Sequence, residues 1–265
     1  MSDINLYLAT LAKKLSVTKE EREKIDTSIN YLKGKVWERF QDRLDKVEVF
    51  GSYDRDTSLS PSIDQNADVD ILVIFKTNDY QPNTFLNHLN EFAKNLYQRS
   101  DVSPDHPAIT IELNHVKFEL VPAYWEVNTF SDDDLMIPAP RNKEIKWIET
   151  EPQKLKEDLE RKNNRENQMI TPLVILVKYL NYLHGKPYDS YIIEQFAISR
   201  SYPDSGLKNY LYEIINDMTT NSQTEAQVAF VNELKLRRKN LLNLEKSGLT
   251  DYIEQELAKF LPMPK

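Results

Sequence analysis

The sequence contains no cysteine among its 265 residues. Disulfide bonds, thiolate metal sites and cysteine nucleophiles are therefore excluded. A chain without disulfides suits a reducing compartment, and we expect a cytoplasmic location. The four histidines are scattered without the spacing of zinc ligands, so we expect no zinc site.

Long apolar runs and an excess of basic residues are also missing. No stretch approaches the roughly 20 residues that cross a bilayer, and the N-terminus MSDINLYLATLAKKL is amphipathic rather than signal-like, so we expect no membrane association. Lysine and arginine number 34 against 42 aspartates and glutamates, which gives a net charge of −8. Proteins that grip a long phosphate backbone usually carry a basic face, so we expect no stable nucleic-acid binding.

The first half of the chain has the pattern of strands flanked by helices. Apolar residues recur at helical spacing over residues 1–45 and again in YQPNTFLNHLNEFAKNLYQRS. Between these stretches, KVEVFGS alternates like a strand, and the continuous apolar run VDILVIF is typical of a central strand. AITIEL and VKFELVPAYW are separated by two residues, which predicts a β-hairpin.

The second half reads as helical. Residues 126–150 have a loop-like composition, and from Pro152 onward the pattern predicts helices, with TPLVILVKYLNYL as a buried one, another over SYIIEQFAISRS and two more toward the C-terminus. We therefore predict an α+β protein of two domains. Residues 1–150 form the first, with a mixed sheet flanked by helices, and residues 151–265 form a helical lobe.

Two carboxylates stand at the head of the central strand. Asp68 and Asp70 are separated by one residue, so on a strand both side chains point to the same face. Two carboxylates this close repel each other unless a cation lies between them or one takes up a proton. One interpretation is a solvated pair before the strand. The other is a Mg²⁺ site, because this cation binds carboxylates together with substrate phosphates.

A glycine and a third carboxylate favour the metal site. Gly51 follows the first strand, where it lets backbone amides approach a ligand, and Ser52 adds a hydroxyl that can bond a phosphate oxygen. Glu119 lies on the strand VKFELVPA, on the face opposite Phe118 and Leu120. If that strand neighbours VDILVIF, Glu119 can share a metal with the two aspartates. Two cations would then clamp the attacking and leaving oxygens of a phosphoryl displacement.

These segments carry a family resemblance. GSYDRDT, DVDILV and the later FELVPA resemble the nucleotidyltransferase superfamily typified by DNA polymerase beta. Within it, the chain is most similar to the oligoadenylate synthase and cyclic GMP-AMP synthase branch, including the bacterial cGAS/DncV-like enzymes of antiphage signalling. The resemblance implies a polymerase-beta-like core, a C-terminal helical lobe and an active site in the cleft between them. It also implies two Mg²⁺ ions, with Mn²⁺ as a possible substitute, on Asp68, Asp70 and Glu119, and the third carboxylate as general base.

The second half of the sequence also resembles this nucleotidyltransferase family. TPLVILVKYLNYL and DSYIIE are similar to the lobe that holds the donor nucleotide, and WIETEP resembles the linker into it. This implies that Lys178 neutralises the triphosphate, Ser190 bonds it and Tyr191 stacks on the donor base. The expected enzyme joins nucleoside triphosphates, as donor and acceptor, into a cyclic or short linear oligonucleotide second messenger and releases pyrophosphate. The product would act on a separate effector protein in antiphage defence.

Two alternatives are kept. The first is a nucleotidyltransferase that modifies RNA, tRNA or a protein, in the manner of a toxin. It predicts a basic track beside the cleft, whereas the chain is acidic. The second is a catalytically inactive nucleotide-binding module. It is kept because the superfamily usually has aspartate at the third acidic position, where this chain has Glu119.

Overall fold

The chain divides into two compact units, and each is described by itself. The computed structural model describes residues 4–77, 79–105, 107–129, 132–140, 146–202, 206–220 and 224–264. The sheet unit comprises Thr18–Arg55 and Gln65–Leu155, and the helical unit comprises Met1–Val17, Asp56–Asp64 and Lys156–Lys265. Both units are thus discontinuous in sequence. The predicted division into domains 1–150 and 151–265 stays a prediction.

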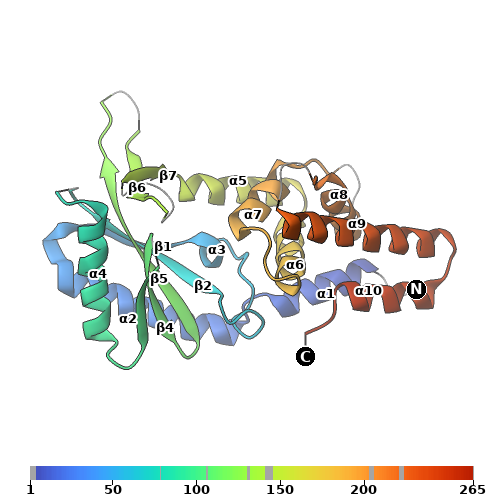
Figure 1. Ribbon diagram of the computed structural model, residues 1–265, viewed down its shortest axis with the longest axis horizontal. Helices are drawn as coiled ribbons and strands as arrows, with labels where there is room; N and C mark the ends of the chain where they lie inside the picture. The colour runs from blue at the N-terminus through green and yellow to red at the C-terminus, as the bar shows by residue number, and fades with distance from the viewer. Residues whose placement is uncertain are drawn as a thin grey trace. The chain divides into compact units, whose positions relative to one another are not determined.

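The sheet unit is built on a mixed sheet, which has seven strands in the described residues (Figure 1). In chain order, the strands are β1 Leu44–Phe50, β2 Asp68–Phe75, β3 Asp101–Asp105, β4 Ala108–Leu113, β5 Val116–Glu126, β6 Asp134–Pro138 and β7 Trp147–Thr150. Their order is β1-β2-β5-β4-β3, with β6 on β5 and β7 on β6. β2 and β5 run parallel, and the other pairs are antiparallel. The predicted central strand and the β4–β5 hairpin are confirmed.

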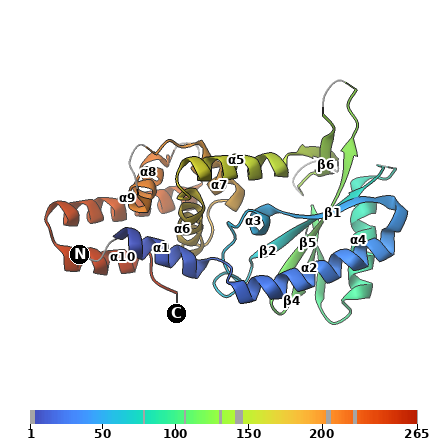
Figure 2. The same ribbon diagram turned by 180° about the vertical axis from the view of Figure 1, so that it is seen from behind.

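Two helices cover one face of this sheet. They are α2, Lys19–Phe40, which begins with a capping box between Thr18 and Glu21, and α4, Pro82–Leu96. On β2, the ring of Phe75 meets Phe40 of α2 at 5.5 Å and Phe85 of α4 at 4.6 Å between centroids. Figure 2 shows α2 running along the sheet. Because the odd-numbered side chains of β2 are buried there, its even-numbered ones point to the other face.

The region predicted to be loop-like contains two strands. Residues 134–138 and 147–150 form β6 and β7, so that part of the prediction for 126–150 was wrong. Each segment is only four or five residues long and mixes apolar with charged side chains, so the alternation is too short to stand out in the sequence. They become strands because the long β5 extends past its hairpin and offers its edge to β6. Two short turns complete this unit, the 3-10 helix Gln41–Arg43 and α3, Gly51–Asp54.

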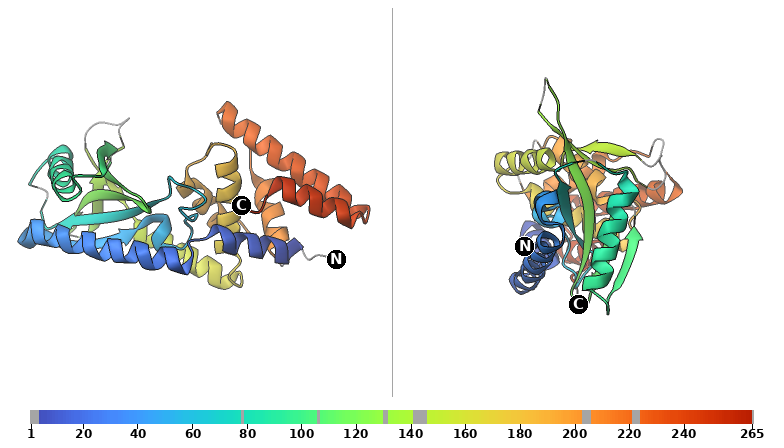
Figure 3. Two further views of the ribbon diagram at one scale, coloured as in Figure 1. Left: turned by 90° about the horizontal axis from the view of Figure 1, so that it is seen from below. Right: turned by 90° about the vertical axis from the view of Figure 1, so that its left-hand side faces the viewer.

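The helical unit packs around a buried central helix. Its helices are α1 Ile4–Leu15, most of α5 Pro152–Arg165, α6 Ile170–Leu183, α7 Ser190–Ser199, α8 Leu207–Asp217, α9 Glu225–Lys246 and α10 Thr250–Phe260. As predicted, α6 is buried nearly all round. After α7, the described residues form three helices rather than the predicted two, because α9 and α10 are separated by a turn at Gly248, whose φ is +67° (Figure 3).

The predicted α+β class is confirmed: a mixed sheet flanked by helices is joined to a helical C-terminal region. Among the described helices, none is both long and apolar enough to cross a membrane.

Candidate active site

Three carboxylates share the face of the sheet opposite α2 and α4. β2 and β5 pair in parallel, with Asp70 opposite Glu119 and Asp68 opposite Lys117. Register partners on adjacent strands point to the same face, as do residues two apart on one strand. All four charged side chains therefore gather on one face at one end of the parallel pair. The condition set by the sequence, that the strand of Glu119 neighbours the strand of the aspartates, is met.

The same face turns apolar farther along the strands. Leu72 and Ile74 of β2, with Val121 and Ala123 of β5, are buried there against Leu135 of β6. The carboxylates thus stand at the border of a hydrophobic cluster, where water is partly excluded. An ionised carboxylate in such a place loses much of its hydration.

Asp70 bears the largest electrostatic cost. Burial raises its pKa well above the ordinary value of an aspartate, and the negative charges of Asp68 and Glu119 raise it further. Arg55 and Lys117 offset only part of this effect. A proton or a cation would remove the cost, so this crowding of charge suits a cation that prefers oxygen ligands.

Gly51 makes room for Asp70. Its φ is +76°, a conformation that side-chain-bearing residues rarely adopt, and a Cβ at this position would lie 1.9 Å from Oδ2 of Asp70. The glycine is therefore required by the backbone and by the neighbouring carboxylate at once. That Gly51 also lets backbone amides approach a ligand stays a prediction. Ser52 follows it in α3.

Lys117 is the residue that sequence reasoning missed. Its Nζ lies 2.7 Å from Oε1 of Glu119 and 3.9 Å from Oδ2 of Asp68. Burial alone would lower the pKa of Lys117, but the hydrogen bond to Glu119 and the charges of Glu119, Asp68 and Asp105 outweigh it, and the net direction is upward. The two-residue spacing from Lys117 to Glu119 is the signal that could have placed this lysine on the acidic face.

The three carboxylates do not converge on a single metal position. In the part of the chain that the structure describes, no three histidine, cysteine, aspartate or glutamate side chains converge on a common metal position. Glu119 instead directs Oε1 at Lys117. The donor set still fits a divalent cation, because three oxygen ligands of one sign are crowded together and Asp70 is held toward its protonated form.

A buried hydroxyl lies beside the third carboxylate. Thr110 of β4 is the register partner of Glu119 on the side away from β2. It is 3% exposed, and its Oγ1 has no hydrogen-bond partner among the described residues. A buried hydroxyl without a partner is costly, so this donor is available to a group that moves toward it.

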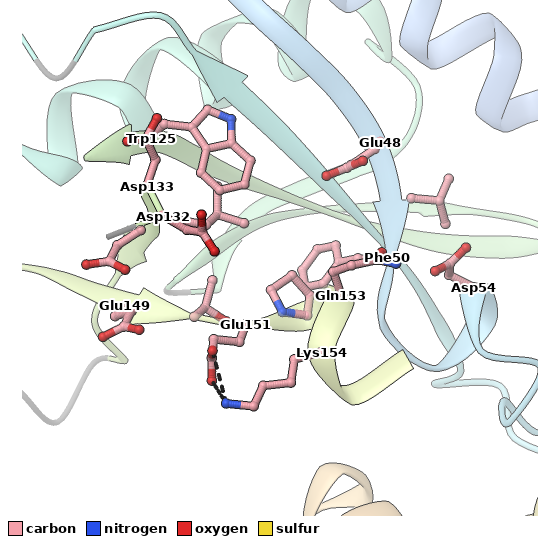
Figure 4. Close-up of a pocket in the computed structure, with 15 residues that line it drawn as sticks. Glu48, Phe50, Asp54, Trp125, Asp132, Asp133, Glu149, Glu151, Gln153 and Lys154 are labelled. Carbon is pink, nitrogen blue, oxygen red and sulfur yellow. Dashed lines mark hydrogen bonds and ion pairs between the residues drawn. The ribbon is translucent and has the colours of Figure 1, made fainter. Parts of the chain in front are cut away.

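A pocket of about 280 Å³ adjoins the same side of β1 (Figure 4). Phe50 lines it and is the register partner of Asp70. Its acidic lining residues are Glu48, Asp54, Asp132, Asp133, Asp134, Glu149 and Glu151. Lys154 also lines it, and its Nζ is bonded to Glu151 at 2.8 Å. Such a pocket repels phosphate and suits a ligand that presents N–H donors or positive charge.

The helical unit contains the residues expected to hold the donor nucleotide. Lys178 is only 5% exposed, and its Nζ lies 2.6 Å from Oε1 of Glu194, which is fully buried. The hydroxyl of Thr57 donates to the same Glu194 oxygen at 2.8 Å. The charge of Lys178 is therefore already neutralised within the unit.

The other two expected nucleotide contacts open the next helix. Ser190 is the first residue of α7 and is exposed, and Tyr191 is 50% exposed. The side chain of Asp189 caps the helix by accepting from the backbone N–H of Tyr191 at 2.7 Å. The hydroxyl of Tyr191 accepts from Gln195 at 2.8 Å, which helps to fix the half-exposed ring.

Comparisons with known proteins agree with this geometry. A family model described as the Second Messenger Oligonucleotide or Dinucleotide Synthetase domain matches residues 1–163. No curated protein sequence gives a significant match. The cyclic AMP-GMP synthase DncV of Vibrio cholerae is similar in structure, with a TM-score of 0.77 and 11% identity over 96% of this chain and 94% of that one.

Two further solved structures are similar. The CD-NTase CdnG of Bradyrhizobium diazoefficiens, solved in complex with GTP, has a TM-score of 0.72 and 13% identity over 98% of this chain and 99% of that one. CdnC of E. coli MS115-1, solved with ATP, has a TM-score of 0.69 and 13% identity over 97% and 98%. These likenesses confirm the predicted polymerase-beta-like fold. Since the family model covers more than half of the sequence, the chain belongs to the Second Messenger Oligonucleotide or Dinucleotide Synthetase family of nucleotidyltransferases.

Proposed function

We propose that this enzyme is Mg²⁺-dependent, joins nucleoside triphosphates into a cyclic or short linear oligonucleotide, and releases pyrophosphate. The observation that carries the proposal is the gathering of Asp68, Asp70 and Glu119 on one face of β2 and β5, next to Gly51. Relatives of similar fold have been solved with GTP and with ATP, which supports nucleoside triphosphates as donor and acceptor.

The proposed reaction forms one phosphodiester bond at a time. A ribose hydroxyl of the acceptor attacks the α-phosphorus of the donor, the bond from that phosphorus to the bridging oxygen breaks, and pyrophosphate leaves. The hydroxyl proton passes to an Oε atom of Glu119, which acts as general base. A second bond of the same kind, made within the linear product, closes a ring.

The residues of the sheet unit have separate proposed roles in binding the metal ions and the phosphates. Asp68, Asp70 and Glu119 would hold two Mg²⁺ ions, or Mn²⁺ in their place. When bound, these ions supply charge stabilisation for the attacking and leaving oxygens. Gly51 keeps open the space that the carboxylate of Asp70 occupies. Ser52 bonds a phosphate oxygen with its hydroxyl.

The helical unit contributes the proposed contacts to the donor nucleotide. Tyr191 stacks on the donor base, which its exposure permits, and the exposed Ser190 bonds the triphosphate. Lys178 neutralises the triphosphate. To do so, its ammonium has to exchange Glu194 for a phosphate oxygen, since the two are paired at 2.6 Å. The family resemblance also supports a cytoplasmic location and release of the product to a separate effector protein in antiphage defence.

Labelled nucleoside triphosphates, incubated with the protein and Mg²⁺ without nucleic acid, test the proposal. We expect small products that resist phosphatase, together with pyrophosphate, and neither from the Asp68→Asn/Asp70→Asn double variant. Mass spectrometry of the products identifies the bases and distinguishes rings from linear forms. Label that appears only on added RNA or protein would instead support the macromolecule-modifying alternative.

One observation favours the second candidate, a nucleotide-binding module without turnover. Glu119 is bonded to Lys117 rather than turned toward the two aspartates. Binding of a nonhydrolysable triphosphate, with no pyrophosphate release in Mg²⁺ or Mn²⁺, would establish this candidate and exclude the first.

A further inference from the structure

A lysine ammonium lies among the carboxylates of the candidate metal site. The side chains of Lys117 and Glu119 are only 20% and 21% exposed, and they are joined by a hydrogen bond of 2.7 Å. Asp68 lies on the other side of the same ammonium, 3.9 Å from it. Lys117 therefore supplies positive charge at the place where the chain gathers negative charge.

The same carboxylate oxygen cannot serve the lysine and a metal ion equally. A charge-assisted hydrogen bond between ammonium and carboxylate is stronger than a neutral one, especially where water is partly excluded. A cation that takes Glu119 as a ligand has to overcome this bond. This agrees with the failure of the three carboxylates to converge in the described residues.

We propose that Lys117 is the resident counter-ion of the metal-free site, which holds Glu119 until a divalent cation displaces it. The inference rests on the proposed function, because it takes Glu119 to be a metal ligand. Lys117 is then a positioning residue that sets the cation concentration at which the site becomes complete.

Lys117 and Glu119 each have an alternative interaction partner nearby. The register partner of Lys117 on β4 is Glu112, whose side chain points to the same face, and the negative charge of Asp105 also favours the ammonium. Glu119 has Thr110 beside it in register, with a buried hydroxyl that bonds nothing else among the residues described. Alternative partners for both halves of the ion pair make an exchange between two arrangements physically reasonable.

The affinity of the nucleotide-free protein for Mn²⁺ tests this proposal. Electron paramagnetic resonance measures the concentration of free Mn²⁺ during the titration. Lys117→Met keeps the apolar stem and removes the charge, and we expect it to bind Mn²⁺ about tenfold more tightly than the wild type. Lys46→Met is the matched control. Lys46 also forms an ion pair with a glutamate two residues ahead, Glu48, on the neighbouring strand β1. We expect its Mn²⁺ affinity to stay within about twofold of the wild type.

A second measurement follows Lys117 directly in the wild-type protein. Nuclear magnetic resonance of protein labelled with ¹³Cε-lysine gives one signal for each lysine. The signal that is absent from the spectrum of Lys117→Met belongs to Lys117. Addition of Mg²⁺ should shift it, because the ammonium leaves Glu119, whereas the signal of Lys46 should stay in place. The Mg²⁺ titration itself uses the wild-type protein, and the variant serves only to assign the signal.

The outcomes separate the inference from the proposed function. Tighter Mn²⁺ binding by Lys117→Met alone supports the inference, and so does a Mg²⁺-induced shift of the Lys117 signal. Equal or weaker binding by Lys117→Met, with a Lys117 signal that Mg²⁺ leaves unchanged, overturns the inference while the metal site stands. If neither wild type nor Lys117→Met binds Mn²⁺ without nucleotide, the inference is overturned, and the pyrophosphate assay with nucleoside triphosphates and Mg²⁺ then decides whether the proposed function stands or fails with it.

Discussion

Replacement of Gly51 by alanine should separate activity from stability. The new Cβ would lie 1.9 Å from Oδ2 of Asp70, whereas ordinary contact begins at 3.4 Å. The carboxylate must therefore retreat by about 1.5 Å, and a displacement of about 1 Å from a reactive geometry can cost 100-fold in rate. We expect pyrophosphate release by Gly51→Ala to fall about 100-fold or more.

The cost in stability should be modest. The atoms that would clash are Oδ2, Cγ and Cβ of Asp70, at 1.9, 2.8 and 3.1 Å, so the whole carboxyl group has to turn away. If it can do so, the remaining cost is that of an alanine at φ +76°, about 1–2 kcal/mol. Gly185→Ala is the matched control, because Gly185 has φ +78° and nothing within 4 Å of its Cβ position. Both variants should lose about 1–2 kcal/mol of unfolding free energy in urea. Only Gly51→Ala should lose activity.

Two results would refute this reasoning. If Gly51→Ala kept its rate within about threefold of the wild type, Asp70 would not need its present position. If it lost far more stability than Gly185→Ala, the backbone rather than the carboxylate would explain the glycine. Urea unfolding followed by circular dichroism, beside a pyrophosphate assay on the same samples, decides both points.

Three further predictions follow from the charged groups and the exposed ring. Because the pKa of Asp70 is raised on folding, its favourable contribution is present below an ordinary aspartate pKa and is lost as the pH rises through the raised value. Asp70→Asn should therefore stabilise the metal-free protein at pH 7, and less so at pH 4, in urea titrations with chelator. Lys178→Met and Glu194→Gln should each cost about 3–5 kcal/mol, because each leaves a buried partner without its counter-charge. The double variant should cost less than their sum in the same titrations. Tyr191→Ala should raise the KM for nucleoside triphosphates without lowering the melting temperature, since its ring is half exposed, whereas Tyr191→Phe should keep the KM.

The sequence was sufficient to predict which side chains share a face of each strand. Alternation placed Asp68 and Asp70 together and set Glu119 opposite Phe118, and the structure has this arrangement. Alternation has a period of two, so it specifies a face but neither the neighbouring strand nor the register. The sequence analysis could only assume that these two strands are neighbours, and it predicted neither the parallel pairing of β2 with β5 nor the register that sets Asp70 opposite Glu119.

Contacts between distant segments could not be predicted. Residues 56–64 follow the turn at Gly51 directly, yet they belong to the helical unit, where Thr57 bonds Glu194 across 137 residues of sequence. Nothing local marks such a contact, because it depends on how the helices pack. For the same reason, the expectation that Lys178 neutralises a triphosphate could not include its buried ion pair with Glu194.

The two buried charge clusters explain why the chain tolerates like charges at the head of a central strand. In the helical unit, Lys178 and Glu194 balance each other, so the cluster is complete as it stands. In the sheet unit, the positive charges of Arg55 and Lys117 lower the pKa of Asp70, but burial and the charges of Asp68 and Glu119 outweigh them, and it stays raised. Under the proposed function, a divalent cation balances the carboxylates of this face, so that its binding removes the cost of their crowding and stabilises the fold.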